Sequence, residues 1–135
     1  MVTKFFIRWI LPLVMVLAAW ELGWWYGAGV RPVLPWTLDR QLRAGSTVYL
    51  ADVRLPVEYR LFHLRGSHSH PELVFDQTAL EALPRDTPIV LVCMTGHRSS
   101  FAGWELRKMG FTNVASLTGG ALGWLLTLHD IERGE

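Results

Sequence analysis

The chain has 135 residues, enough for one domain of ordinary size and little more. Its formal net charge of +1, with no run of Lys or Arg, excludes the basic surface of a nucleic-acid-binding protein. Its only cysteine, Cys93, excludes an intramolecular disulfide, a CxxC redox pair and a multi-cysteine zinc site.

Residues 1–29 predict a transmembrane helix that acts as a signal anchor. Residues 9–20 carry no charge; Lys4 and Arg8 precede them, and the aromatic cluster at 24–26 follows them. Trp and Tyr gather at membrane interfaces, and a helix over 5–26 is long enough for a hydrocarbon core about 30 Å thick. The sequence therefore favours a protein attached to a membrane by one helix.

Two alternatives to the anchor remain open. A cleaved signal peptide would end near Ala18-Ala19, and a buried helix of a soluble domain is the third interpretation. The anchor is favoured because the aromatic cluster lies beyond the cleavage position. The short basic N-terminal tail gives a slight preference for a domain outside the cytoplasm, although basic residues also follow the helix.

Residues 30–35 predict a stiff linker because they contain two prolines, and the soluble domain is expected over 36–135. Within it, we expect helices over 38–44, 56–64, from Asp76 to about 83, from 99 or 100 to 110, and after 119–120. Strands are expected over 47–53, 89–92 and 113–117, with a weak strand or loop over 67–71. This alternation predicts an α/β domain with a mostly parallel central sheet and helices on both faces.

The candidate reactive group is Cys93, which follows the apolar strand 89–92 and precedes a short loop and a helix. Backbone N–H groups and the positive end of a helix dipole stabilise negative charge on a sulfur placed there. Gly96 permits a tight backbone curl, and Arg98 adds a fixed cation. An ordinary buried cysteine is the alternative, but this combination favours a nucleophilic thiolate or a bound anion.

Further polar residues are expected near this loop. Asp52 and Arg54 end another strand and therefore lie at the same edge of a parallel sheet. We expect Asp52 to accept backbone hydrogen bonds in a structural role, and Arg54 to lie at a substrate rim or in a surface ion pair. The three histidines over 63–70 lack a nearby carboxylate or thiol, so no metal site is predicted.

Four elements in this order resemble a rhodanese-like sulfurtransferase domain, from about Trp36 to Ile131. They are the Asp-Val-Arg of 52–54 with Glu58-Tyr59, the His-Leu-Arg-Gly-Ser of 63–67, the Cys93 loop, and the Leu-Thr-Gly-Gly of 117–120 followed by Trp124. Two departures are Phe62, where the family usually has Gly, and the polar stretch 67–71. The resemblance implies a rhodanese-like three-layer sandwich, here preceded by the transmembrane helix.

The resemblance also implies a chemistry without a cofactor. The Cys93 thiolate would take sulfane sulfur from a donor such as thiosulfate, forming a persulfide, and pass it to a thiol or cyanide. The backbone N–H groups of the loop would hold the charge of the outer sulfur, with Arg98 attracting the anionic donor. We expect contributions to substrate binding or the pocket wall from Met94, Thr95, Gly96, His97, Arg98 and Arg54. The alternatives are a solvent-facing loop histidine for His97 and an exposed loop cation for Arg98. Ser99 either donates a hydroxyl hydrogen bond there or caps the following helix.

Two other functions are weighed against an enzyme. A non-catalytic module or persulfide carrier acting with a partner protein would share every one of these residues. A Cys-dependent phosphatase needs five residues between Cys and Arg, whereas four separate Cys93 from Arg98, and no acidic residue in the loop offers a general acid. The spacing therefore favours sulfur transfer over phosphate-ester hydrolysis.

Overall fold

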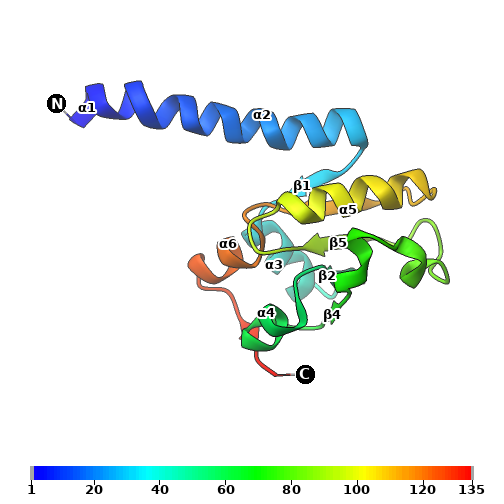
Figure 1. The fold of residues 1–135 in the computed structure, drawn as a ribbon. Helices are drawn as coiled ribbons and strands as arrows, with labels where there is room; N and C mark the ends of the chain where they lie inside the picture. Colours follow the sequence, from blue (N-terminus) through cyan, green and yellow to red (C-terminus); the bar gives the residue numbers. More distant parts are fainter. Residues whose placement is uncertain (1, 135) are drawn as a thin grey trace.

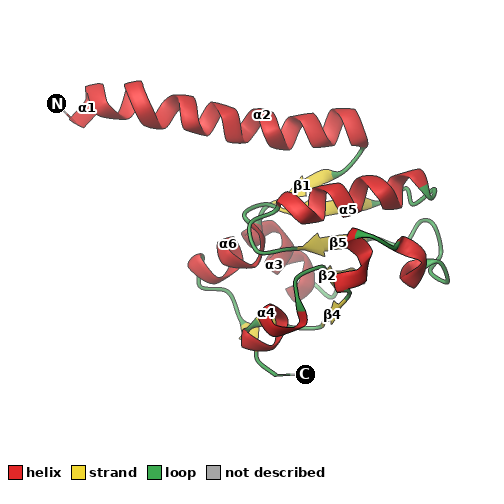
Figure 2. Cartoon of the chain, in the orientation of Figure 1, coloured by secondary structure: helices red, strands yellow, loops and turns green. Residues whose placement is uncertain are grey.

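The computed structural model describes residues 2–134 and has an α/β fold around a five-stranded sheet (Figures 1 and 2). The strands lie in the order β1-β6-β5-β2-β4, and every neighbouring pair is parallel. Their bounds are β1 Arg31–Val33, β2 Tyr49–Asp52, β4 Ser67–Ser69, β5 Ile89–Val92 and β6 Val114–Leu117. The expectation of a mostly parallel central sheet is confirmed. Because all five strands are parallel, their C-terminal ends lie on one side of the sheet, which we call the carboxyl edge.

Helices cover both faces of this sheet because its strands alternate their apolar side chains between two cores. Leu91 and Cys93 face one core, and Val90 and Val92 face the other. The first core is closed by α5 (His97–Lys108) and the 3-10 turns η2 (Pro71–Val74) and η3 (Gln77–Leu80). The second is closed by α3 (Pro35–Arg43) and α6 (Gly120–Leu126), which together with the sheet make three layers.

The N-terminal segment is one continuous helical run that packs on the domain only near its end. It comprises α1 (Val2–Phe5), the π-helical η1 (Phe6–Ile10) and α2 (Leu11–Ala28). Pro12 lies in the first turn of α2, directly after the π-helical stretch. The stretch Phe6–Ala28 is long and apolar enough to cross a membrane, and none of its most apolar window is buried in the molecule. A core helix would be largely buried, so that alternative is disfavoured.

The predicted linker is wrong, because residues 31–33 form β1, an edge strand of the sheet. Arg31 pairs with Ala115 and Val33 with Leu117. Pro32 is tolerated because an edge strand has one unpaired side on which a missing N–H costs nothing. Val30, just before the strand, is only 1% exposed. The domain therefore begins before Trp36.

Several other boundaries differ from expectation. The helix expected over 56–64 is α4 (Pro56–Leu61), and residues beyond it form β3 (His63–Leu64), which pairs antiparallel with β7 (Ile131–Glu132). The helix expected after Asp76 is only the short η3, although Asp76 does cap it by accepting from the Thr78 N–H. Helix α5 begins at His97, two residues earlier than expected, and this places Arg98 in its first turn.

Candidate active site

Cys93 lies directly after β5 at the carboxyl edge, and its side chain is nearly enclosed. The residue is 1% exposed. The backbone N–H of Gly96 donates to Cys93 Sγ at 2.9 Å, and the Ser99 hydroxyl lies 3.4 Å from the same sulfur. The sulfur also sits at the start of α5, where N–H groups have no partner within the helix. The Gly96 N–H, the Ser99 hydroxyl and the start of α5 all place positive partial charge near the sulfur.

Two glycines let the backbone curl at this position. Gly96 has φ +101°, in the left-handed region that favours glycine. Gly120 is at φ +58°, and a Cβ there would lie 2.3 Å from Cys93 O. This close approach allows two hydrogen bonds that fix the loop, from Ala121 N to Cys93 O at 2.7 Å and from Leu122 N to Met94 O at 3.0 Å. The Gly-Gly pair therefore holds the start of α6 against the backbone of the Cys93 loop.

A buried hydroxyl cluster supports the loop from below. Ser99 Oγ lies 3.1 Å from Gly96 O and 2.8 Å from Ser116 Oγ, a residue of β6. Ser100 Oγ also donates to Gly96 O, at 2.9 Å. All three serines are at most 2% exposed. Ser116 was not singled out from the sequence, because nothing in the pattern of β6 distinguishes it from an ordinary strand residue.

The remaining loop residues lie around Cys93 but differ in their contacts. Met94 is half-buried, whereas Thr95 and His97 are exposed and lie 3.1 Å apart, from Thr95 Oγ1 to His97 Nδ1. Five inward N–H groups are expected from the sequence; in the described part of the chain, only that of Gly96 donates to Sγ itself. The His97 ring packs on Trp20 of α2, with 5.1 Å between ring centroids.

Arg98 is held beside the loop by a residue from another element. Its Nη2 lies 3.3 Å from both carboxylate oxygens of Glu58 in α4. Glu58 Oε2 also accepts from the Leu55 N–H at 2.8 Å, which caps α4 and fixes the carboxylate. The Arg98 side chain is 39% exposed, so it remains open to solvent on one side. The pairing was not anticipated, because the two residues are 40 positions apart.

Arg54 requires a correction: it lies neither at a rim nor in a surface ion pair. Its side chain is fully buried and forms an ion pair with Asp52. Arg54 Nη2 lies 2.7 Å from Asp52 Oδ2, and Arg54 Nε lies 2.9 Å from Asp52 Oδ1. Nη2 also donates to Phe62 O, and the guanidinium lies over the Phe62 ring. Asp52 accepts the Arg54 backbone N–H at 3.0 Å, which is a structural role. Burial next to Phe62 keeps this cation away from solvent.

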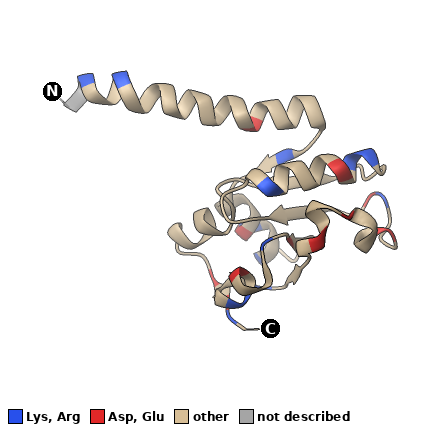
Figure 3. Cartoon of the chain, viewed as in Figure 1, with Lys and Arg blue, Asp and Glu red and all other residues tan. Residues whose placement is uncertain are grey.

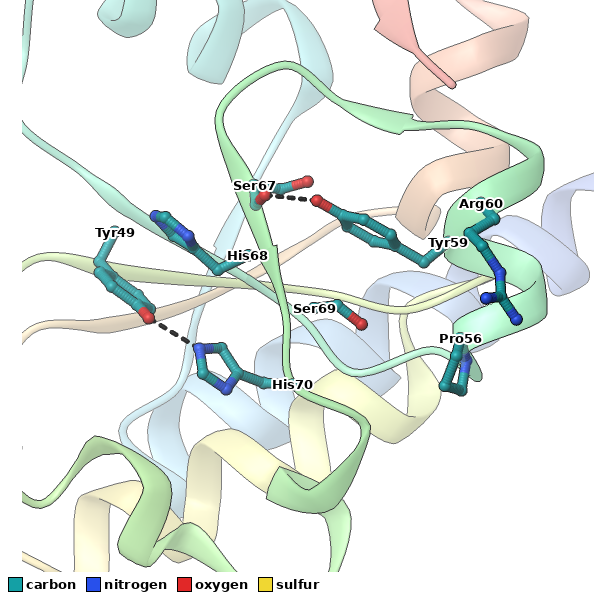
Figure 4. A pocket seen from close by; sticks show the side chains of 8 residues that line it. All are labelled: Tyr49, Pro56, Tyr59, Arg60, Ser67, His68, Ser69 and His70. Carbon is teal, nitrogen blue, oxygen red and sulfur yellow. Dashed lines mark hydrogen bonds between the residues drawn. The ribbon is translucent and has the colours of Figure 1, made fainter. Parts of the chain in front are cut away.

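A pocket of about 550 Å³ lies along β4 and α4, apart from the Cys93 loop (Figure 4). The Tyr49 hydroxyl lies 2.7 Å from His70 Nε2, and His70 Nδ1 lies 2.7 Å from Glu72. Burial, and then the Glu72 carboxylate, raise the pKa of the Tyr49 phenol above its ordinary value. His68 stacks on Tyr49. Among the described residues, no three His, Cys, Asp or Glu side chains are grouped to hold a metal ion.

Relatives of known sequence share this domain. The chain is 38% identical over 86 residues to the thiosulfate sulfurtransferase GlpE of Pseudomonas paraeruginosa, covering 63% of this chain and 76% of the relative. It is 37% identical over 93 residues to the probable adenylyltransferase/sulfurtransferase MoeZ of Mycobacterium tuberculosis, covering 68% of this chain and 24% of the relative. The chain thus spans about a quarter of the length of that larger relative.

Solved structures show the same fold. A thiosulfate sulfurtransferase from Pseudomonas aeruginosa superposes with a TM-score of 0.70 at 23% identity, covering 88% of this chain and 23% of that one. The CoADR-RHD protein of Bacillus anthracis superposes with a TM-score of 0.60 at 31% identity, covering 70% and 16%. The family model described as the rhodanese-like domain matches residues 35–127. The chain therefore belongs to the rhodanese-like domain family.

Proposed function

We propose that this protein is a membrane-tethered sulfurtransferase that carries sulfane sulfur on Cys93 as a persulfide. The observation that carries the proposal is the enclosed thiol at the head of α5, with the Gly96 N–H 2.9 Å from its sulfur. A preformed donor that needs no rearrangement stabilises charge most effectively, and loss of one such donor costs about 3 kcal/mol. The relatives named as sulfurtransferases give independent support.

The reaction has two displacement steps. In the first, the Cys93 thiolate attacks the outer sulfur of thiosulfate, a new S–S bond forms, and the old S–S bond breaks to release sulfite. In the second, a thiolate or cyanide attacks the outer sulfur of the persulfide, which regenerates the Cys93 thiolate and releases a new persulfide or thiocyanate. Both steps conserve charge and require no cofactor. The Gly96 N–H and Ser99 hydroxyl stabilise the thiolate at the start and the end of the cycle.

Arg98 is the cation available to attract the donor. Its guanidinium is partly exposed, whereas that of Arg54 is buried against Asp52. The Glu58 carboxylate offsets part of its charge and fixes its position. Thiosulfate carries two negative charges, so it can pair with the side of the Arg98 guanidinium that faces solvent. Met94, Thr95 and His97 are proposed to line the entrance.

The tether is the N-terminal helical run, which is apolar over Phe6–Ala28 and would enter the membrane with the part that is not packed on α5. A cleaved signal sequence is the other outcome. The two are separated by expressing the full chain with a C-terminal tag and fractionating membranes. A full-length product that resists carbonate extraction supports the tether; a shortened product in the soluble fraction contradicts it.

Mass measurement tests the sulfur chemistry directly, because Cys93 is the only cysteine. The full chain in detergent micelles, incubated with thiosulfate, is expected to gain the mass of one sulfur atom and to lose it when cyanide is added, with thiocyanate appearing in solution. Cys93→Ser is expected to keep its circular dichroism spectrum and to gain nothing. Sulfur gain by Cys93→Ser, or no gain by the parent chain with any sulfane donor, would overturn the proposal.

The same measurement separates an enzyme from a persulfide carrier. A carrier gains the sulfur but releases it slowly to cyanide or small thiols and rapidly to a partner protein. The adenylyltransferase/sulfurtransferase relatives favour this second function, because their names join the sulfurtransferase to another activity in one protein. Turnover with small acceptors as fast as loading supports the enzyme.

A further inference from the structure

The direction in which the N-terminal helix leaves the domain is fixed by contacts at two places. Trp20 packs on His97, the first residue of α5. Nine residues later, Gly29 lies against Arg107 in the last turn of α5, because a Cβ on Gly29 would be 2.8 Å from Arg107 Nε. Helix α2 therefore runs alongside α5 in the same direction. Since α5 starts at the carboxyl edge, the part of the run before Trp20 projects beyond that edge (Figure 1).

The projecting part is nearly as long as a bilayer is thick. Residues 2–19 number eighteen, and at 1.5 Å per helical residue they span about 27 Å, against about 30 Å for a hydrocarbon core. Lys4 and Arg8 are the only charged residues over 4–20, and Figure 3 shows blue segments only near the start of the run. Arg8 lies about 18 Å before Trp20, so its long side chain must extend to the far headgroup layer. Trp20, Trp24 and Trp25 lie at the level of the domain, which suits an interfacial aromatic belt. A membrane crossed by this stretch would therefore lie against the carboxyl edge.

Exposed apolar side chains gather at this edge. We call them the apolar rim; its members are Leu55 and Val57 at the start of α4 (56% and 57% exposed), and Leu122, Leu126 and Leu128 in and after α6 (39%, 71% and 90% exposed). Both helices begin where strands β2 and β6 end. Figure 1 shows α4 and α6 on the side of the sheet toward which the N-terminal run extends. Leu128 also has φ +60°, which an exposed leucine adopts at a cost.

We propose that the carboxyl edge docks on the bilayer surface through the apolar rim, so that the Cys93 loop opens into the interfacial layer. The inference rests on the proposed tether, and it adds the orientation of the active site. Single exposed leucines scattered over a surface are normal. Here they lie on the face toward which the membrane helix projects, where they can insert into the apolar part of the bilayer surface. Sulfur acceptors held at the membrane surface then reach Cys93 more readily than large acceptors in solution.

Spin labels on the full chain in lipid nanodiscs test the docking. Single cysteines are introduced into Cys93→Ser as Leu126→Cys in the rim, Asp86→Cys before β5 at the opposite edge, and Leu13→Cys in the run. Collision with oxygen reports lipid, and collision with a water-soluble nickel chelate reports solvent. We expect the Leu13 label in lipid, the Asp86 label in water, and the Leu126 label several-fold less accessible to nickel than the Asp86 label.

The outcomes distinguish this inference from the proposals on which it rests. A Leu126 label as accessible to nickel as the Asp86 label, with the Leu13 label in lipid, overturns the docking and keeps the tether. A Leu13 label in water overturns the tether. Spin–spin broadening at Leu126 that vanishes on dilution with empty nanodiscs assigns the rim to a second copy of the chain and overturns the docking. Because every protein here lacks the Cys93 thiol, failure of the sulfur chemistry does not affect the result.

Substitutions in the rim give a matched control. With the label moved to Leu122→Cys, the pair Leu126→Ser and Leu128→Ser is expected to raise nickel accessibility several-fold. Phe75→Ser removes an equally exposed apolar residue outside the rim, 89% exposed against 90% for Leu128, and is expected to leave it unchanged. Equal effects of the two sets of substitutions would contradict docking through the rim.

Discussion

Two arginine–carboxylate pairs lie near the Cys93 loop, and burial separates their functions. The Asp52–Arg54 pair is wholly buried, and Arg54 donates to both oxygens of the carboxylate. The Glu58–Arg98 pair is partly exposed, with N–O distances of 3.3 Å. Water screens the second pair and leaves its cation available, while the first cannot lose one member without stranding a buried charge. The same pairing thus supports the fold in one place, and in the other it is part of the anion site that we propose.

The largest expected effect comes from breaking the buried pair. Asp52→Ala leaves the Arg54 guanidinium without its carboxylate, and we expect the free energy of unfolding to fall by about 3–5 kcal/mol. Urea denaturation of the full chain in micelles measures this. The double substitution Asp52→Leu with Arg54→Met removes both charges and should be less destabilising than Asp52→Ala alone. A loss below about 1 kcal/mol for Asp52→Ala would contradict the structural importance of the pair.

Next in size is the contribution of the hydroxyl that contacts the sulfur. Ser99→Ala removes the donor 3.4 Å from Cys93 Sγ, and we expect sulfur loading to slow about tenfold, equal to about 1.4 kcal/mol. Rapid-quench mass measurement of the persulfide follows the rate. Ser100→Ala is the control, because its hydroxyl bonds to Gly96 O but not to the sulfur. A larger effect for Ser100→Ala would show that loop support matters more than the direct contact.

Removing one member of the exposed Glu58–Arg98 pair should change thiosulfate binding and hardly affect the free energy of unfolding. We expect Arg98→Ala to raise the KM for thiosulfate several-fold while changing the free energy of unfolding by less than about 1 kcal/mol. Glu58→Gln keeps an oxygen to accept the Leu55 N–H and frees the guanidinium, so the KM should fall. Steady-state kinetics with cyanide as acceptor measure both. An unchanged KM in Arg98→Ala would rule out its role in attracting the donor.

The smallest expected effect is that of salt on the KM for thiosulfate. It tests the difference between the exposed and the buried pair in the parent chain. Raising the salt concentration from about 0.05 to 0.5 M shortens the Debye length and screens exposed charges more than buried ones. We therefore expect the thiosulfate KM of the parent chain to rise and that of Arg98→Ala to change less. If the KM for thiosulfate depended equally on salt in the parent chain and in Arg98→Ala, the charge that attracts thiosulfate would not be that of Arg98.

The sheet and its central strand could be predicted because their signals are local. The apolar run of 89–92 between turn residues predicts β5 at its observed bounds, and β6 begins one residue after its predicted start. By contrast, β1, β3 and β7 have two or three residues each, too few for a periodic pattern. They exist because partners far along the chain pair with them, as Arg31 pairs with Ala115. Such pairing leaves little trace in a short segment of sequence.

In the candidate site, too, the features with local signals could be predicted and those that depend on distant residues could not. The placement of Cys93 and Gly96 follows from a strand, a glycine and a helix start that are adjacent in the sequence. The burial of Arg54 depends on Phe62, and the position of Arg98 depends on Glu58, so both are decided by tertiary packing. Phe62 stands where the resemblance leads one to expect Gly, and its ring lies on the guanidinium of Arg54. That departure therefore lies beside a buried cation.

The contact at Gly120 has a mechanical consequence. Its backbone lies so close to the Cys93 carbonyl that no side chain fits between them, and α6 is hydrogen-bonded to the loop at two successive residues. We therefore expect a displacement of α6 to move the Cys93 loop with it. We expect contact at Leu122 and Leu126, on the outer face of α6, to shift the Cys93 sulfur and so to change the rate of the proposed sulfur transfer.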